Sequence, residues 1–206
     1  MDNVIITISR SYGSGGRKIG RRLADELGID YLDRKLLRIA SDKSGINEQL
    51  FAQADETLRN TPVFRAARKV YNGEVIGPES DDFTSNENLF RYQAKVIREI
   101  ASTSSCVIIG RCANVVLSDM PHVLRVYIHA PLEYRLQALA DVHPVDKHAR
   151  TRIIDEKDER RAAYYRYFTG FDWKDADHYD LSLDSAALGE DRCVELIKQY
   201  LSIRTK

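Results

Sequence analysis

The sequence of 206 residues predicts a three-layer α/β fold, in which helices cover both faces of a five-stranded parallel sheet. Two observations support this prediction. Short apolar runs of strand length alternate with longer segments of helical periodicity along the chain, as in proteins built from β-α units. Runs such as residues 4–8 and 106–109 are continuously apolar, which is typical of strands buried on both faces. No linker divides the chain, and we therefore expect residues 1–206 to form a single domain.

The first apolar run leads into a glycine-rich turn and then into a basic helix start. Glycines let backbone N–H groups turn inward, a helix N-terminus carries partial positive charge, and a cationic side chain neutralises phosphate. The turn is therefore predicted to bind the phosphates of a nucleotide. An ordinary βα turn, in which the glycines only permit tight packing, is the alternative. The residues expected to bind phosphate are Gly13, Ser14, Gly15, Gly16, Arg17 and Lys18.

This turn differs from the G-x-x-x-x-G-K-[ST] pattern of phosphate-binding loops. If Gly16 is the last glycine, Ser11 replaces the first glycine and Arg17 replaces the lysine. The next residue is Lys18, so the hydroxyl group that contacts Mg²⁺ is missing from its usual place. A guanidinium is longer and wider than an ammonium group, so the phosphate must sit differently in this loop.

The first helix is predicted to end at Gly28, and residues 29–33 to form the second strand. Two interpretations of Asp33 stay open. Its side chain either caps a helix over residues 34–40 or serves as a ligand group at the carboxyl end of a parallel strand, where α/β proteins bind ligands.

Residues 41–86 are the least regular part of the chain. Short helical stretches are expected to begin near residues 44–47 and 60–62, with turns between and after them. The segment is either a solvated excursion or a substrate-binding flap, because long excursions in compact domains are often functional.

A long amphipathic helix is predicted over residues 87–103, and Arg111 follows the buried strand at 106–109 after a single glycine. This position puts a guanidinium at the same sheet edge as the glycine turn. Because arginine suits bidentate contact with phosphate, Arg111 is expected to bind a second anion. Pairing of Arg111 with a carboxylate is the alternative.

The remaining chain is predicted to contain two more strands and three helices. The segment 146–168 is dense in charge and is either a solvated helix with i,i+4 ion pairs or a cationic lid over phosphates. The aromatic run at 164–168 is expected to pack against the sheet rather than to stack on bases. The other elements are a strand at 123–128, a helix from Pro131, a stop at Gly170, a strand at 179–184, a loop at 185–189 and a helix at 190–203 with Cys193, Val194, Leu196, Ile197 and Leu201 inward.

Composition excludes several classes of partner. The 31 basic and 31 acidic residues balance, which does not favour nucleic acid. The three cysteines form no C-x-x-C pair, so a reduced, cytoplasmic protein without disulfides or zinc is expected. No apolar run reaches membrane-span length or has the form of a signal peptide, and we expect no membrane partner. Composition does not show which small molecules the protein binds, and the oligomeric state stays open; small-molecule nucleotides are the partners that the family resemblance described below implies.

Taken together, these motifs resemble the nucleoside monophosphate kinase fold of the P-loop NTPase superfamily, and most specifically the cytidylate kinase-like family. The resemblance covers nearly the whole chain and is weakest over residues 41–86. It implies a phosphotransferase that moves the γ-phosphate of ATP to a (deoxy)cytidylate-like acceptor with Mg²⁺. It also implies that residues 41–86 form a helical acceptor-binding insert and residues 144–169 a lid. The matching segments are residues 8–20, 31–34, 106–111 and 179–184.

The resemblance also assigns roles to single residues. Arg17 takes the place of the loop lysine, and Arg111 matches the arginine of a Gly-Arg-Asp motif that helps to bind the acceptor. Cys112 replaces the aspartate of that motif, which leaves the acceptor open. The Mg²⁺ ion would be held by ATP oxygens and waters, with Ser14 or an acidic group as a further ligand. The residues expected to act in catalysis are Arg17, Arg111, Arg160 and Arg161, and those expected to bind the acceptor are Asp33, Arg34, Arg98 and Arg111.

Two other functions are compatible with the sequence. The missing lysine, hydroxyl and aspartate support a nucleotide- or phosphate-binding regulatory protein without transfer activity. A kinase acting on another small phosphorylated or hydroxylated acceptor is the third possibility. Phosphoryl transfer needs mainly positioning and charge cancellation, so the retained cations keep the kinase hypothesis in first place.

Overall fold

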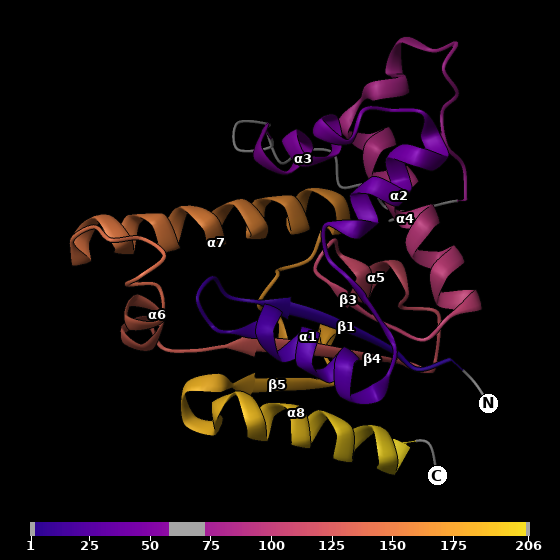
Figure 1. The fold of residues 1–206 in the computed structure, drawn as a ribbon. Helices are drawn as coiled ribbons and strands as arrows, with labels where there is room; N and C mark the ends of the chain where they lie inside the picture. The colour runs from indigo at the N-terminus through magenta and orange to yellow at the C-terminus, as the bar shows by residue number, and fades with distance from the viewer. Residues whose placement is uncertain (1–2, 58–72, 205–206) are drawn as a thin grey trace.

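The computed structural model describes residues 3–57 and 73–204 (Figure 1). Within these residues the centre of the molecule is one sheet of five parallel strands in the order β2-β3-β1-β4-β5. This arrangement confirms the predicted fold class. The strands are β1 (Ile5–Arg10), β2 (Asp30–Leu32), β3 (Cys106–Ile109), β4 (Val123–His129) and β5 (Leu181–Asp184).

Helices cover both faces of this sheet, which gives the three layers (Figure 1). α1 and α8 pack on one face, and α2, α4, α5 and the end of α7 pack on the other. Across the described part of the chain, no helix is both long and apolar enough to cross a membrane. The helices are α1 (Gly16–Leu27), α2 (Lys35–Ser44), α3 (Glu48–Thr57), α4 (Asn86–Thr103), α5 (Ala113–Val116), α6 (Leu132–Ala138), α7 (Lys147–Thr169) and α8 (Ser185–Arg204), with short 3₁₀ turns η2 (Asp81–Thr84) and η3 (Ala176–His178).

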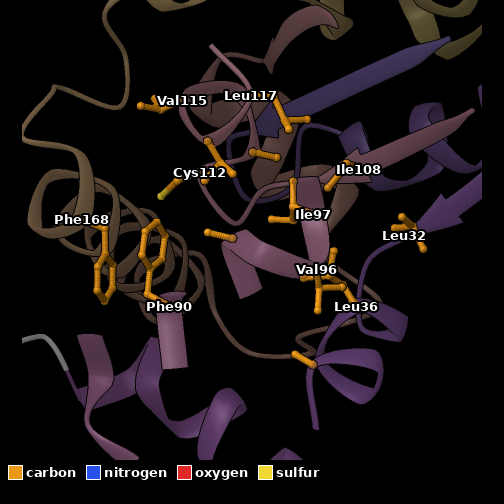
Figure 2. Packing of buried hydrophobic residues seen from close by; sticks show 14 of the residues in the cluster. Leu32, Leu36, Phe90, Val96, Ile97, Ile108, Cys112, Val115, Leu117 and Phe168 are labelled. Carbon is orange, nitrogen blue, oxygen red and sulfur yellow. The ribbon is translucent and has the colours of Figure 1, made fainter. Parts of the chain in front are cut away.

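The alternation of side chains along β1 explains why two cores form. Ile5 is buried in the core beneath α2 and α4, whereas Ile6 and Ile8 are buried in the core beneath α1 and α8. Successive side chains of a strand point to opposite faces, so a continuous apolar run serves both layers. Figure 2 shows the first core, where Phe90 of α4 and Phe168 of α7 stack with ring centroids 4.2 Å apart.

Helix ends follow the predicted glycines. Gly28 and Gly170 end α1 and α7 in the left-handed conformation, with φ of 64° and 76°. A left-handed residue after the last helical turn lets its N–H bond back to that turn, and glycine adopts this conformation without steric cost. Both predicted stops are confirmed.

Two local predictions are wrong. The predicted loop at 185–189 is a helical turn up to Gly189, whose φ of 76° and ψ of 163° separate it from the rest of α8. Leu196 was expected inward but is 38% exposed. Of the two interpretations left open for Asp33, the structure does not show the helix cap, because the N-cap residue is Arg34 and no side chain caps α2.

The predicted insert at 41–86 contains the end of α2, then α3 and η2. The helical start predicted at 60–62 lies outside the described residues.

The chain leaves β1 and β3 toward opposite faces of the sheet. α1 follows β1 and packs in one core, while α5 follows β3 and packs in the other. β1 and β3 are hydrogen-bonded neighbours, paired from Ile5 with Cys106 to Ile8 with Ile109. Where two adjacent parallel strands send their connections apart, a crevice opens at their carboxyl ends. This crevice is the position at which the sheet is expected to bind a ligand.

Candidate active site

A cleft of about 510 Å³ lies at this edge of the sheet. The ends of β1 and β3 form its floor, and α2, α3 and α7 contribute its walls. Among the described residues, seven cationic side chains and one carboxylate, Glu48, line it. The cationic residues are Arg10, Arg17, Arg34, Arg111, Lys157, Arg160 and Arg161. Such an excess of positive charge in a concave site attracts polyanions.

The glycine turn presents the N-terminus of α1 beside this cleft. Gly15 precedes the helix in the left-handed conformation with φ of 76° and provides no side-chain cap. The N–H groups of the first helical turn have no carbonyl partner within a helix, and they carry partial positive charge. The turn thus has the properties of an anion-binding helix start.

Close packing holds the turn in this shape. Gly13 has a φ of 83°, and a Cβ atom there would lie 3.2 Å from the backbone oxygen of Arg135, so the position favours glycine. Ser14 is fully buried, and its hydroxyl group donates to the backbone oxygens of Ser11 at 2.9 Å and Ile128 at 3.1 Å. Because Ser14 is fully buried, its hydroxyl oxygen is not accessible to an ion in the cleft, which does not fit the role of an additional Mg²⁺ ligand.

Arg17 and Asp33 form an ion pair at the rim, with Nε and Oδ2 2.9 Å apart. The two residues also line an adjoining groove, together with Arg34. Lys18 does not line the cleft but lines this groove, where its side chain is 79% exposed and its Nζ atom lies 3.7 Å from Glu190. Asp33 therefore lies at the carboxyl edge of the sheet, as one of its two predicted interpretations required.

Arg10 lies in the floor of the cleft and was missed by the sequence analysis. Burial together with the neighbouring guanidinium groups of Arg161 and Arg17 lowers the pKa of Arg10 to about 9. The sequence does place Arg10 at the carboxyl end of the first strand, which is the signal that could have identified it. The glycines that follow drew the prediction to the turn instead.

Arg111 enters the cleft from a strained turn. Gly110, Arg111 and Cys112 all have positive φ, at 69°, 59° and 54°. A left-handed conformation costs a residue with a side chain roughly 1–2 kcal/mol, and such residues cluster at functional sites. Cys112, the residue in the aspartate position of the family motif, is 4% exposed and also lines the cleft.

α7 brings Lys157, Arg160 and Arg161 to the cleft. Asp158 fixes the helix to the glycine turn, because its carboxylate accepts from the backbone N–H of Tyr12 at 2.7 Å and from Arg135 at 2.7 Å. The same carboxylate accepts from Arg161 at 3.2 Å. Burial is the main reason that the pKa of Arg161 is lowered. Of the two arginines predicted for the lid, Arg161 is therefore held beside the start of the turn that is predicted to bind phosphate.

Aromatic side chains form the apolar wall of the cleft. Tyr164 and Tyr165 of α7 line it together with Trp173, which follows α7 and was not predicted as a site residue. The hydroxyl group of Tyr165 accepts from the side-chain amide of Asn114 at 2.8 Å, and burial raises the pKa of Tyr165. Phe168 of the same run is buried in the core, where it stacks on Phe90 of α4 rather than on the sheet as predicted.

Arg98 is not brought to the cleft, which corrects its prediction as an acceptor-binding residue. It lies on α4, where its guanidinium group makes a bidentate ion pair with Asp119 at 2.7 and 2.8 Å and donates to the backbone oxygen of Val116. These hydrogen bonds lower the pKa of Asp119. Helical periodicity placed Arg98 on a polar face but could not show that the turn at Asp119 covers it.

Residues 3–57 and 73–204 contain no cluster of three or more His, Cys, Asp or Glu side chains placed to hold a metal ion. The carboxylates at the cleft and its rim are Glu48 and Asp33. Mg²⁺ in kinase sites is usually bound through one or two carboxylates plus substrate phosphates, rather than by an all-protein cage. These residues fit an ion that arrives with a nucleotide.

The strand order and the helices on both faces of the sheet define a class of three-layer α/β proteins that includes solved kinases. Solved structures with this architecture include a shikimate kinase from Bacteroides thetaiotaomicron, with a TM-score of 0.55 and 12% identity over 97% of this chain and 98% of that one. A shikimate kinase from Acinetobacter baumannii in complex with shikimate has a TM-score of 0.51 and 16% identity over 99% and 96% of the chains. An uncharacterized protein from Eubacterium ventriosum has a TM-score of 0.71 and 22% identity over 97% and 99%.

Within that class, the chain belongs to the cytidylate kinase-like family, whose model matches residues 5–187. It is similar to a cytidylate kinase from Methanopyrus kandleri, with 26% identity over 95% of this chain and 92% of the relative. A cytidylate kinase from Ignicoccus hospitalis is 24% identical over 96% of this chain and 98% of that protein. The family resemblance inferred from the sequence is therefore confirmed.

Proposed function

We propose that the protein transfers the γ-phosphate of ATP to a (deoxy)cytidylate-like nucleoside monophosphate. One observation carries the proposal: seven cationic side chains and a single carboxylate surround a cleft beside the N-terminus of α1. A site built this way suits two substrates that are both polyanions. Membership of the cytidylate kinase-like family and the similarity to proteins named cytidylate kinase support the choice of a nucleotide acceptor.

In this reaction an oxygen of the acceptor phosphate attacks the γ-phosphorus of ATP. The new P–O bond forms as the bond from the γ-phosphorus to the β,γ-bridging oxygen breaks, which yields ADP and a nucleoside diphosphate. The attacking phosphate is already ionised, so no residue has to remove a proton. Catalysis then depends on holding both phosphates in line and cancelling their charge.

The cleft offers cations for both phosphate groups. The backbone of residues 13–18 and Arg17 bind the ATP phosphates, while Arg111 and Arg34 bind the acceptor phosphate. Arg160 and Arg161 act on the transferred group from α7, which excludes water as the predicted lid. Tyr164, Tyr165 and Trp173 provide an apolar wall for the acceptor base.

Mg²⁺ is the expected cofactor, and when bound it offsets charge on the ATP phosphates. Asp33 and Glu48 are the carboxylates that would hold it, directly or through water. The hydroxyl group of Ser14 stays with the backbone. We also expect the protein to be cytoplasmic, where ATP and nucleoside monophosphates are available.

The test is ADP release from ATP across a panel of ribo- and deoxynucleoside monophosphates, with Arg160→Ala and Arg152→Ala as a matched pair. Both arginines lie on α7, but Arg160 lines the cleft and Arg152 is exposed outside it. We expect acceptor-dependent release with cytidylates, reduced at least a hundredfold in Arg160→Ala and unchanged in Arg152→Ala.

Other outcomes assign a different function. If ADP release depends on another acceptor, the protein is a phosphotransferase whose acceptor is not a cytidylate. If no acceptor supports release while ATP binds with micromolar affinity, the protein is a nucleotide-binding regulator and the proposal is wrong.

A further inference from the structure

We propose that the side chain of Arg10 is the phosphate-binding cation of the glycine turn. It takes the role of the lysine that such loops carry at the start of the helix. The inference rests on the proposed function in that it assigns the phosphate as that of ATP. It departs from the sequence analysis, which gave this role to Arg17.

The spacing of the turn supports the exchange. In the pattern G-x-x-x-x-G-K, four residues separate the first glycine from the last, and the lysine follows directly. Counted from Arg10, the same spacing leads to Gly15 and then to Gly16. In this register an arginine replaces the first glycine and a glycine replaces the lysine. The structure agrees with it, because Gly15 is the N-cap of α1 and Gly16 is the first helical residue.

The two exchanged positions touch each other. A Cβ atom on Gly16 would lie 2.6 Å from Cβ and 3.1 Å from Cγ of Arg10. Real Cβ atoms do not approach this closely, and the clash is with the stem of Arg10 rather than with its flexible end. Arg10 can therefore occupy its place only if residue 16 has no side chain. The two substitutions depend on each other.

A second glycine gives room for the charged end of Arg10. A Cβ atom on Gly110 would lie 2.4 Å from Nη1 of Arg10. The guanidinium group therefore lies against the turn that carries Arg111, between the end of β1 and the end of β3. Arg10 lines the cleft there together with Gly110, Arg111 and Arg17 of the first turn of α1.

The surroundings of Arg10 carry an excess of positive charge, which an anion would offset. Its Nε atom is buried without a hydrogen-bond partner in the described structure. Arg161 donates to the backbone oxygen of Arg10 at 3.2 Å, and Arg17, Arg111 and Arg161 all repel its positive charge. The carboxylate that counteracts them is that of Asp33, which is already paired with Arg17. A phosphate group in the cleft would provide the missing acceptor and the missing charge.

The experiment compares Arg10→Met with Arg17→Met, using ATP and inorganic tripolyphosphate as probes in titration calorimetry. Tripolyphosphate isolates the phosphate contact from contacts to the nucleoside. We expect Arg10→Met to raise the Kd of both probes at least thirtyfold, while Arg17→Met raises it less than tenfold. Arg152→Ala is the control on a guanidinium outside the cleft. If Arg17→Met causes the larger loss and Arg10→Met stays within threefold of the unmodified protein, the proposal is overturned.

A swap variant tests the mutual dependence. Gly16→Lys alone should lower Tm, because its stem collides with Arg10. The double variant Arg10→Gly with Gly16→Lys removes the collision and restores the usual pattern, so it should bind tripolyphosphate at least tenfold more tightly than Arg10→Gly. A Gly16→Lys variant as stable as the unmodified protein, or a swap no better than Arg10→Gly, would contradict the exchange.

These measurements separate the two proposals. Absence of ADP release with every acceptor would refute the kinase but would leave the effect of Arg10 on tripolyphosphate binding intact. Loss of the Arg10 effect in an active kinase would refute only the exchange.

Discussion

The outer surface and the cleft differ in how many carboxylates accompany their cationic side chains. On the outer helices, cations are matched with carboxylates: Arg22 with Glu26 and Asp191, Lys198 with Glu26, Lys147 with Glu133, Lys43 with Glu99, and Arg98 with Asp119. In the cleft, seven cationic side chains share one lining carboxylate among the described residues. The whole chain is neutral, so this excess reflects placement rather than composition.

The difference shows which charges serve the fold and which serve a ligand. Exposed pairs contribute little each and keep the surface soluble. Crowded, partly buried cations cost stability, as the lowered pKa values of Arg10 and Arg161 indicate. Proteins tolerate this loss of stability at functional sites, where crowded charges and a strained backbone often occur together. The positive φ of Arg111 is a second sign of the same kind.

The largest expected effect comes from removing a cleft cation. Arg111→Ala should lower kcat/KM about a hundredfold to a thousandfold, the usual effect of losing one preorganised donor at a transferring group. Arg111→Gly should lose the same activity but melt at a higher temperature than Arg111→Ala, because glycine adopts φ of 59° without strain. Steady-state ADP release and thermal unfolding check both expectations. Activity within tenfold of the unmodified protein would show that Arg111 pairs structurally instead.

The next effect tests Asp158, whose carboxylate pairs with Arg161 of the cleft and with Arg135 of α6. Asp158→Asn should lower the free energy of unfolding by about 2–3 kcal/mol, because it leaves the partly buried Arg135 and Arg161 without their countercharge. The matched control is Asp172→Asn, which removes an exposed partner of Arg166 and should cost less than about 1 kcal/mol. Urea unfolding measures both. Equal effects for the two variants would contradict the distinction between cleft and surface charge.

The sequence predicted the fold better than the site, for a physical reason. Local sequence patterns predict buried strands and the ends of helices, as the apolar run at 106–109 and the glycine at 170 do. The direction of Arg10 depends instead on the nearby Gly16 and on Gly110, which is distant in the sequence and comes close to Arg10 only once β1 and β3 are paired.

Arg98 shows the converse error. Its face of α4 was predicted correctly as polar, but the turn that supplies Asp119 comes 21 residues later and covers it. Trp173 lies in the connection after α7, so its position at the cleft depends on where that long helix ends. The local sequence around Trp173 does not show this. Arg111 was named from the local sequence because it follows a buried strand after a single glycine, whereas Arg160 and Arg161 were named only through the family resemblance.

A ligand should remove the cost of the crowded cations. Tripolyphosphate at about thirty times its Kd should raise the free energy of unfolding by about 2 kcal/mol, from the linkage between binding and folding. The rise in Tm should shrink in high salt, since screening weakens the attraction. Differential scanning calorimetry with and without tripolyphosphate measures it. A rise of the same size with sulfate at equal ionic strength would point to a general salt effect and against a specific site.

The smallest expected effect lies on the outer surface, at the pair of Arg98 and Asp119. Hydrogen bonds from Arg98 hold the pKa of Asp119 below its usual value, so the carboxylate stabilises the fold above the unfolded-state pKa of about 4. This contribution disappears as the pH falls through the lowered folded-state pKa. Asp119→Asn should therefore cost less than about 1 kcal/mol at pH 7, because the pair is partly exposed, and almost nothing at the acid end.

Urea unfolding of Asp119→Asn and of the unmodified protein between pH 3 and pH 7 gives the difference in stability directly. ADP release by the variant should be unchanged, because the pair lies outside the cleft. A tenfold change in the KM for the acceptor would show that a surface ion pair influences the site. It would contradict the distinction between surface charges that serve the fold and cleft charges that serve a ligand. A stability difference that grows as the pH falls would mean that Asp119 is held in its protonated form, and Arg98 would not be its main partner.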